Sequence, residues 1–98
     1  MKKILERDIQ NEIKDWCKKR NIYHRKISQR FASGFPDTIT VHNGKVFFLE
    51  LKRPGKNPTK LQSIELEEIR KSGGISGVAR SLNDFIGILV AETDAGML

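Results

Sequence analysis

The chain has 98 residues, of which 38% are hydrophobic and 31% charged, and 18 Lys and Arg against 12 Asp and Glu give a formal net charge of +6. This length suits one domain with a thin core, which association with a second copy would extend. The composition excludes a disordered chain and a membrane-spanning one, because the longest apolar stretch, residues 85–91, falls far short of the ~20 residues that a transmembrane helix needs.

The first predicted element is an amphipathic helix over residues 4–20. Its apolar side chains recur at steps of three and four positions, the period of a helix that packs one face against a core. These side chains are Leu5, Ile9, Ile13, Trp16 and Cys17. Residues 22–31 mix β-forming side chains with cations and predict an edge strand, and residues 33–36 predict a turn.

A β-hairpin follows, and it is the clearest pattern in the chain. Residues 37–42 and 45–52 are rich in β-branched and aromatic side chains. They flank Asn43 and Gly44, a pair that suits the positive φ angles of a type I′ turn. We therefore expect two antiparallel strands joined by a two-residue turn.

The remaining residues predict a loop, a helix, a strand and a last helix. The loop covers residues 53–58, and the helix over residues 59–72 ends at two glycines. Residues 75–79 predict a short strand, and the last helix extends to about residue 92, with the final residues frayed. We expect part of this helix, or of the first one, to contact a second subunit, because its apolar stripe is wide for a small sheet to cover. The stripe consists of Leu82, Phe85, Ile86, Leu89 and Val90.

The order of the elements predicts a single α/β domain over residues 1–98. Helices are expected on both faces of a small mixed sheet, because the strand over residues 45–52 carries large apolar side chains that point both ways. An intracellular, cytoplasmic setting is expected as well. The N-terminal residues are charged where a signal peptide needs its apolar centre, and one cysteine makes neither an internal disulfide nor a Cys-rich zinc site.

The hairpin register brings two acids together. Pairing His42 with Lys45 and stepping back along both strands places Asp37 opposite Glu50. Like charges that face each other on a sheet are destabilising, and a carboxylate on a central strand also suffers desolvation. A divalent cation such as Mg²⁺ or Mn²⁺ relieves both problems, and carboxylate oxygens suit these ions.

Lys52 lies two residues after Glu50 and therefore on the same face of the strand. An ammonium group beside two metal-bound carboxylates can steady a nucleophilic water or offset the charge of a phosphoryl transition state. The simpler alternative is that Glu50 and Lys52 form an ion pair at the end of a strand and that Asp37 merely begins one.

Glu6, Gln10 and Gln62 are further candidates. At about 100° per residue, Glu6 falls inside the apolar arc of the first helix, where an acid needs a partner such as a metal site or Lys52 unless the first turn reaches water. Gln62 either supports the site or forms a capping box with Thr59. Gln10, one turn after Glu6, is similarly ambiguous.

These residues form a known pattern. Pro36-Asp37, twelve intervening residues and then Glu50-Leu51-Lys52 resemble the signature of the PD-(D/E)xK nucleases. Nearly the whole chain resembles the VRR-NUC branch of that superfamily, the virus-type replication-repair nucleases. The further residues that carry this resemblance are Glu6, Gln10, Gly34 and Gln62.

The resemblance implies a restriction-endonuclease-like core of the order αβββαβ, here with a further helix, and Mg²⁺-dependent hydrolysis of DNA phosphodiesters, with Mn²⁺ as a substitute. Asp37, Glu50 and the Leu51 carbonyl would bind the metal, and Glu6 would contact it directly or through water. Lys52 would position the attacking water or stabilise charge. Supporting roles would fall to Gln10, Gly34, Pro36 and Gln62.

For stand-alone members, the resemblance implies a homodimer of viral or phage type that acts in DNA repair on branched DNA such as four-way (Holliday) junctions. Neither a membrane nor a small-molecule cofactor is expected. The nucleoid or the cytoplasm of an infected host cell would be its place of action. Cleavage or nicking of linear or flap DNA is the alternative within the enzyme class.

The positive charge is unevenly distributed. Residues 18–30 hold six cations and no acid, and residues 52–60 hold four more cations and no acid. Such patches attract phosphate backbones, anionic lipid or acidic protein, although small proteins are often basic for solubility alone. The alternatives to a nuclease are therefore a non-catalytic DNA-binding module and a basic protein-interaction adaptor. The candidates for phosphate contacts, each of which could instead be a solvated charge, are Arg30, Arg53, Lys56 and Lys60.

Overall fold

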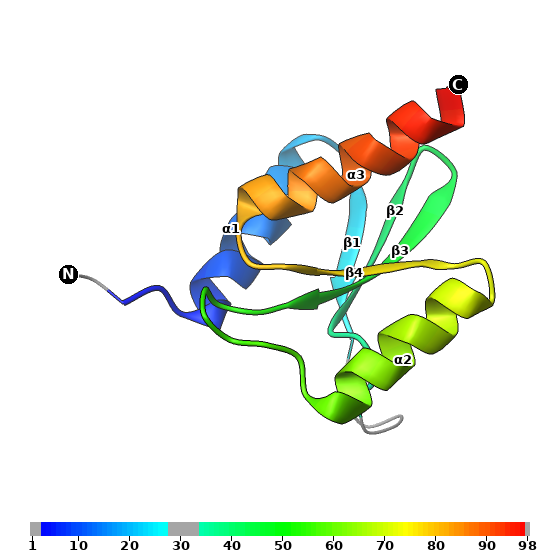
Figure 1. Cartoon of the computed structure of the whole chain (residues 1–98). Coiled ribbons are helices and arrows are strands. Elements are labelled where there is room, and N and C mark those ends of the chain that lie inside the picture. The colour runs from blue at the N-terminus through cyan, green and yellow to red at the C-terminus, as the bar shows by residue number, and fades with distance from the viewer. Residues whose placement is uncertain (1–2, 28–33, 98) are drawn as a thin grey trace.

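The computed structural model describes residues 3–27 and 34–97, which form a four-stranded sheet with helices on both faces (Figure 1). The predicted α/β class, the mixed sheet and the order of the elements are confirmed. In chain order, the elements are α1 (Glu6–Lys19), β1 (Tyr23–Lys26), β2 (Thr38–His42), β3 (Lys45–Leu51), α2 (Lys60–Lys71), β4 (Ile75–Ala79) and α3 (Leu82–Met97).

The strands lie in the order β1-β2-β3-β4. β1 pairs antiparallel with β2, β2 pairs antiparallel with β3, and β3 pairs parallel with β4. A parallel pair needs a crossover connection, and α2 provides it between β3 and β4. β1 is therefore an edge strand, as predicted, and β3 is a central strand whose last three residues, Leu49, Glu50 and Leu51, are buried.

The hairpin has the predicted turn. Asn43 has φ 50° and Gly44 has φ 74°, and His42 pairs with Lys45 across the turn. The ladder has the predicted register and ends with Thr38 opposite Leu49, one pair before the expected backbone pairing of Asp37 with Glu50, which is absent. The reason is that a side chain takes the place of the backbone partner, because the Asp37 N–H donates to the carboxylate of Glu50.

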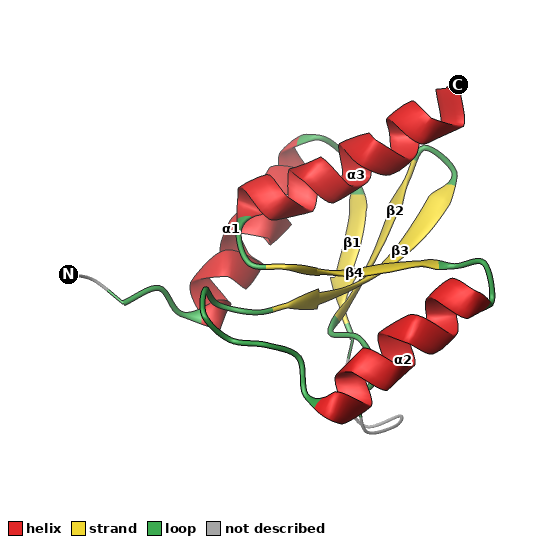
Figure 2. Cartoon of the chain, viewed as in Figure 1, coloured by secondary structure: helices red, strands yellow, loops and turns green. Residues whose placement is uncertain are grey.

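The core lies on the face of the sheet that α1 and α3 cover, whereas α2 packs against β4 on the opposite face (Figure 2). The predicted stripe of α3 is partly used here, since Phe85 and Leu89 are buried within the chain and Val90 is 48% exposed. The core residues are Ile9, Ile13 and Cys17 of α1, Phe47, Leu49 and Leu51 of β3, Ala79 of β4, and Phe85 and Leu89 of α3.

Two element boundaries differ from the predictions. β1 covers Tyr23–Lys26, so Ile22 and Ile27 lie outside the strand, and residues 28–31 of the predicted strand lie outside the described residues. α3 runs to Met97 instead of ending and fraying near residue 92, because no proline interrupts the sequence and alanine and glutamate favour a helix there. None of the helices in the described part of the chain combines the length and apolarity that crossing a bilayer would require.

Candidate active site

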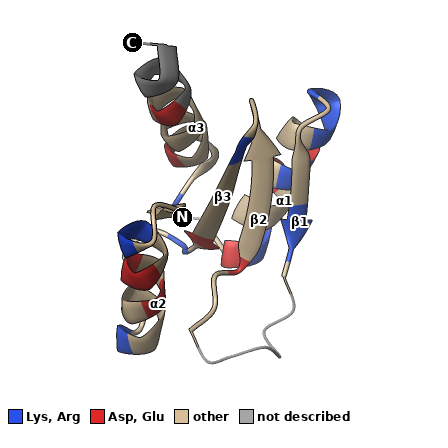
Figure 3. Ribbon diagram, turned by 90° about the vertical axis from the view of Figure 1, so that its right-hand side faces the viewer, with Lys and Arg blue, Asp and Glu red and all other residues tan. Residues whose placement is uncertain are grey.

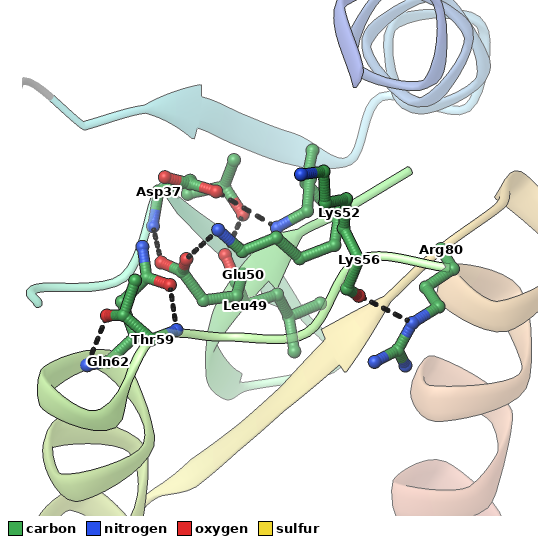
Figure 4. A network of polar contacts seen from close by, with 10 residues as sticks. Asp37, Leu49, Glu50, Lys52, Lys56, Thr59, Gln62 and Arg80 are labelled. Atoms are coloured by element: carbon green, nitrogen blue, oxygen red, sulfur yellow. Dashed lines mark hydrogen bonds and ion pairs between the residues drawn. The ribbon is translucent and has the colours of Figure 1, made fainter. Parts of the chain in front are cut away.

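The carboxylates of Asp37 and Glu50 meet where β2 begins and β3 ends (Figure 4). The Asp37 N–H donates to Oε1 of Glu50 at 2.9 Å, and the Leu51 N–H donates to Oδ2 of Asp37 at 3.0 Å. Each acid thus accepts a hydrogen bond from the backbone of the other segment. Asp37 is 8% exposed and Glu50 is fully buried, so the two acids share a site that is almost closed to water.

The surroundings of Glu50 disfavour its charged form. Its pKa is raised from 4.5 to about 7; burial is the largest cause, and the charge of the neighbouring Asp37 carboxylate and a smaller effect of Glu6 also contribute. The Lys52 ammonium and the Asp37 N–H act in the opposite direction. Nζ of Lys52 lies 3.8 Å from Oε2 of Glu50, and the Lys52 side chain is 16% exposed. The structure therefore places Asp37, Glu50 and Lys52 in one electrostatic unit.

The residues present fit a hard divalent cation. Oε2 of Glu50 is buried and has no hydrogen-bond partner within the described residues, and the Lys52 ammonium lies 3.8 Å from it. A buried carboxylate oxygen without a hydrogen-bond partner destabilises the fold, and a bound cation would supply the missing partner. The two carboxylates are oxygen donors of the kind that Mg²⁺ uses together with several waters, and the part of the Leu51 carbonyl stays a prediction.

Glu6 belongs to the electrostatic surroundings of this pair. It is the first residue of α1, half-buried, and its charge contributes to the raised pKa of Glu50. Among the described residues, no three His, Cys, Asp or Glu side chains come together closely enough to hold a metal ion. Direct coordination by Glu6 therefore stays a prediction. Gln10, one turn later, is half-buried and forms no hydrogen bond with the described residues.

Gln62 forms a capping box. Its N–H donates to Oγ1 of Thr59 at 3.2 Å, and the Thr59 N–H donates to Oε1 of Gln62 at 2.8 Å. Of the two roles that the sequence left open, the structure shows the cap. Figure 4 shows this box in the same polar network as the two acids.

Gly34 and Pro36 shape the turn that leads to Asp37. Gly34 has φ 85°, and a Cβ atom there would lie 2.6 Å from the carbonyl oxygen of Leu61 in the first turn of α2. Pro36 is fully buried. The turn and the start of α2 therefore touch backbone to backbone, which fixes where Asp37 enters β2.

The predicted phosphate contacts lie around the loop between β3 and α2. Arg53 is half-buried, whereas Lys56 and Lys60 are exposed. Arg30 lies outside the described residues.

Arg80, at the end of β4, was missed by the sequence analysis. Its Nε donates to the carbonyl of Lys56 at 3.2 Å, and its Nη2 donates to Oδ1 of Asn57 at 3.0 Å, so it holds the loop in place. The parallel pairing of β3 with β4 brings the ends of both strands to one edge and so places Arg80 beside this loop, and no local sequence pattern signals that placement.

No protein-family model matches this sequence, and no curated protein matches it. Among solved structures, a VRR-NUC domain matches with a TM-score of 0.74 and 27% sequence identity, over 86% of this chain and 92% of that one. The resemblance to VRR-NUC domains is confirmed. A second structure, named a VRR-NUC domain protein, has the same fold, with a TM-score of 0.77 and 18% identity over 93% of this chain and 89% of that one. These VRR-NUC neighbours support a nuclease-family domain.

Proposed function

We propose that the protein is a metal-dependent DNA endonuclease that hydrolyses phosphodiester bonds. The observation that carries the proposal is the buried Oε2 of Glu50, which has no hydrogen-bond partner among the described residues and lies beside Asp37 and Lys52. A purely structural ion pair would not need a second carboxylate at the same place. The likeness to VRR-NUC domains points to the same chemistry.

In this proposal, Asp37, Glu50 and the Leu51 carbonyl hold Mg²⁺, for which Mn²⁺ can substitute. A divalent ion bound there polarises the phosphoryl oxygen and lowers the pKa of a bound water. Glu50 keeps the Lys52 ammonium at the site, and Lys52 positions the attacking water or offsets the negative charge that develops on the phosphate. Glu6 would contact the ion through water or directly. Water attacks the phosphate in line, the P–O bond opposite it breaks, and the departing DNA oxygen takes up a proton from solvent, without a covalent intermediate on the protein.

Branched DNA, such as a four-way junction, is the proposed preferred substrate. This preference rests on the resemblance to stand-alone VRR-NUC nucleases and on the basic surface, to which Arg53, Lys56 and Lys60 contribute. The test measures the rates at which one preparation cleaves linear, flap and four-way DNA of equal length, and the four-way junction is expected to be cleaved fastest. Faster cleavage of linear duplex would favour a restriction-type or nicking nuclease.

The proposed assembly is a homodimer in a reducing, intracellular compartment. A chain of this size has a thin core, and large apolar side chains are exposed at Tyr23 (51%), Val46 (41%) and Val90 (48%). The single cysteine, Cys17, is buried and free, which suits a reducing compartment.

The test of the nuclease proposal is DNA cleavage by single variants of the site. Asp37→Asn, Glu50→Gln and Lys52→Ala are each expected to slow Mg²⁺-dependent cleavage on the order of 10²–10³-fold or more, because each removes a charge aimed at the reacting phosphate or its metal. DNA binding measured in Ca²⁺ should stay within a few-fold of wild type.

The matched control is Glu68→Gln, which removes one acid from the exposed face of α2 and should leave cleavage unchanged. Cleavage by Glu50→Gln at the wild-type rate would overturn the assignment of the site. DNA binding without cleavage in either Mg²⁺ or Mn²⁺ would leave a non-catalytic DNA-binding module instead.

A further inference from the structure

A second basic feature lies outside the candidate active site. A groove of about 690 Å³ runs between the second half of α1 and the edge strand β1. Four of its lining residues are cations, Lys14 and Lys18 from α1 and Arg25 and Lys26 from β1, and none is an acid. Figure 3 shows the basic segments gathered along β1 and the adjoining part of α1.

The cations of the groove are unpaired. Within residues 3–27 and 34–97, none of the four forms an ion pair. Lys14 and Lys18 lie one helical turn apart, a spacing at which like charges destabilise a helix. The fold therefore holds these charges together without compensating them, which indicates an anionic partner from outside the chain.

Aromatic rings fix two guanidinium groups near the groove. The guanidinium of Arg25 lies 4.4 Å from the ring centre of Tyr23, and its Nη1 donates to the carbonyl of His24 at 2.8 Å. Arg20, at the end of α1, lies 4.3 Å from the ring centre of Trp16. A guanidinium that is already ordered loses less side-chain entropy when it binds a phosphate, and Arg matches phosphate oxygens with two hydrogen bonds.

The groove leads toward the two acids. Lys26 pairs with Thr38, and the Ile27 N–H donates to the carbonyl of Asp37 at 2.6 Å. The four residues of β1 span about 13 Å at roughly 3.3 Å per residue. That length lets the edge strand follow a short stretch of one DNA strand toward the two acids.

A purely structural explanation covers only part of the groove. Edge strands often carry Lys or Arg that prevents pairing with another chain, and this explains Arg25 and Lys26. It does not explain Lys14, which lies in the middle of α1, and Lys18 is explained only in part by its place in the last turn of α1, where the helix dipole favours a cation. These two lysines therefore distinguish a binding surface from edge protection.

We propose that this groove binds the phosphate backbone of the DNA arm that flanks the bond to be cut. The inference rests on the proposed nuclease function, but it assigns a second contact surface to residues that lie apart from the acids and from the loop after β3. Lys14, Lys18 and Lys26 contact phosphates along the groove, with Lys26 nearest to Asp37, and Arg25 contacts the backbone from the other side of the edge strand, where it stacks on Tyr23.

The test compares two double variants that remove the same charge. Lys14→Gln/Lys18→Gln removes the two positive charges that α1 contributes to the groove, and Lys45→Gln/Lys71→Gln removes two positive charges outside the groove. Binding of a labelled four-way junction and of a labelled duplex is measured in Ca²⁺ over a range of NaCl concentrations. The groove variant is expected to weaken binding about 10-fold or more near 0.1 M salt and to reduce the slope of log K against log salt by about 2.

Equal weakening by the two double variants would overturn the proposal, because general charge would then explain it. A junction whose arms are too short to reach the groove should bind the groove variant and the wild type alike. If the wild-type protein binds no DNA, the proposed function itself fails. If the wild-type protein binds DNA but the groove variant binds it as tightly as the Lys45→Gln/Lys71→Gln control does, the groove assignment alone fails. Thermal melting of both variants checks that they are folded.

Discussion

Glu50 combines a structural liability with the proposed chemistry. Its carboxylate is fully buried, and burial together with the charge of Asp37 raises its pKa to about 7. Without a cation, the folded protein is therefore penalised whenever Glu50 is ionised. A bound divalent ion would offset that penalty, so metal binding and folding stability are coupled at this one residue.

The pH dependence of stability follows from this pKa. Between the ordinary value of 4.5 and about 7, folded Glu50 keeps a proton that the unfolded chain releases. Stability in EDTA is therefore expected to fall as pH rises through this window and to level off above it. At about 1.4 kcal/mol per pKa unit, the loss from this residue is on the order of 3–4 kcal/mol.

Urea unfolding of wild type and Glu50→Gln at several pH values between 5 and 8 measures this effect. The free energy of unfolding of Glu50→Gln should not fall in this way as pH rises, so the variant should be more stable than wild type at pH 8. Burial also lowers the pKa of His24, which contributes the opposite slope, but His24 is common to both proteins and cancels in their difference. Identical pH profiles for the two proteins would contradict the buried, ionisable Glu50.

At the scale of single residues, the sequence predicted the acid pair because the Asn-Gly turn sets the register of everything behind it. It did not decide the role of Gln62, since a capping box and a site residue need the same spacing from Thr59. Arg80 was invisible, because its partners lie in a loop more than twenty positions earlier in the chain.

At the scale of elements, the packing of the turn at Gly34 against α2 determines how the site is assembled. The glycine has φ 85° and leaves no room for a Cβ beside the Leu61 carbonyl. The entry to β2 and the start of α2 are therefore fixed to each other although no side chain joins them there.

Gly34→Ala is expected to destabilise the protein more than Gly55→Ala does. Gly55 has nearly the same φ, 84°, but a Cβ there meets nothing within 4 Å. Both alanines suffer the left-handed conformation, at roughly 1–2 kcal/mol. Only Gly34→Ala also forces backbone apart, which adds on the order of 1–3 kcal/mol. Thermal or urea unfolding measures the difference, and equal losses would show that α2 moves away freely.

The elements themselves were largely predictable, because each has a clear period. The hydrophobic spacing of α1 and the alternation in β2 and β3 reflect one buried face each. The boundary errors fall where the local signal is weak, at β1 with its cations and at the end of α3. The parallel pairing of β3 with β4 depends on how α2 packs, which no local pattern encodes.

At the scale of the whole molecule, the small core does not bury all of the large apolar side chains. β1, β2 and β3 expose apolar side chains on the face that α2 leaves open, since Tyr23, Val41 and Val46 form one row across the sheet. Tyr23 and Val46 are 51% and 41% exposed. Apolar surface of this kind is typical of proteins that associate.

Light scattering coupled to size-exclusion chromatography is expected to give twice the chain mass of 11.2 kDa at micromolar concentration. Association would hide apolar surface that a small core cannot cover. Moderate salt separates true dimers from charge-driven clusters of a basic protein. A mass of one chain across the concentration range would contradict the proposed dimer.

The two acids also join the start of β2 to the end of β3 by hydrogen bonds in both directions. Each receives a backbone N–H from the segment that carries the other, in place of a regular ladder bond. Truncation of either to alanine would strand a buried donor, so loss of turnover and loss of folding would be confounded. The amides keep an acceptor oxygen, which makes Asn and Gln the informative replacements. An apolar residue at either position would leave a buried N–H without an acceptor, so that end of the sheet tolerates neither exchange unless its backbone is rearranged.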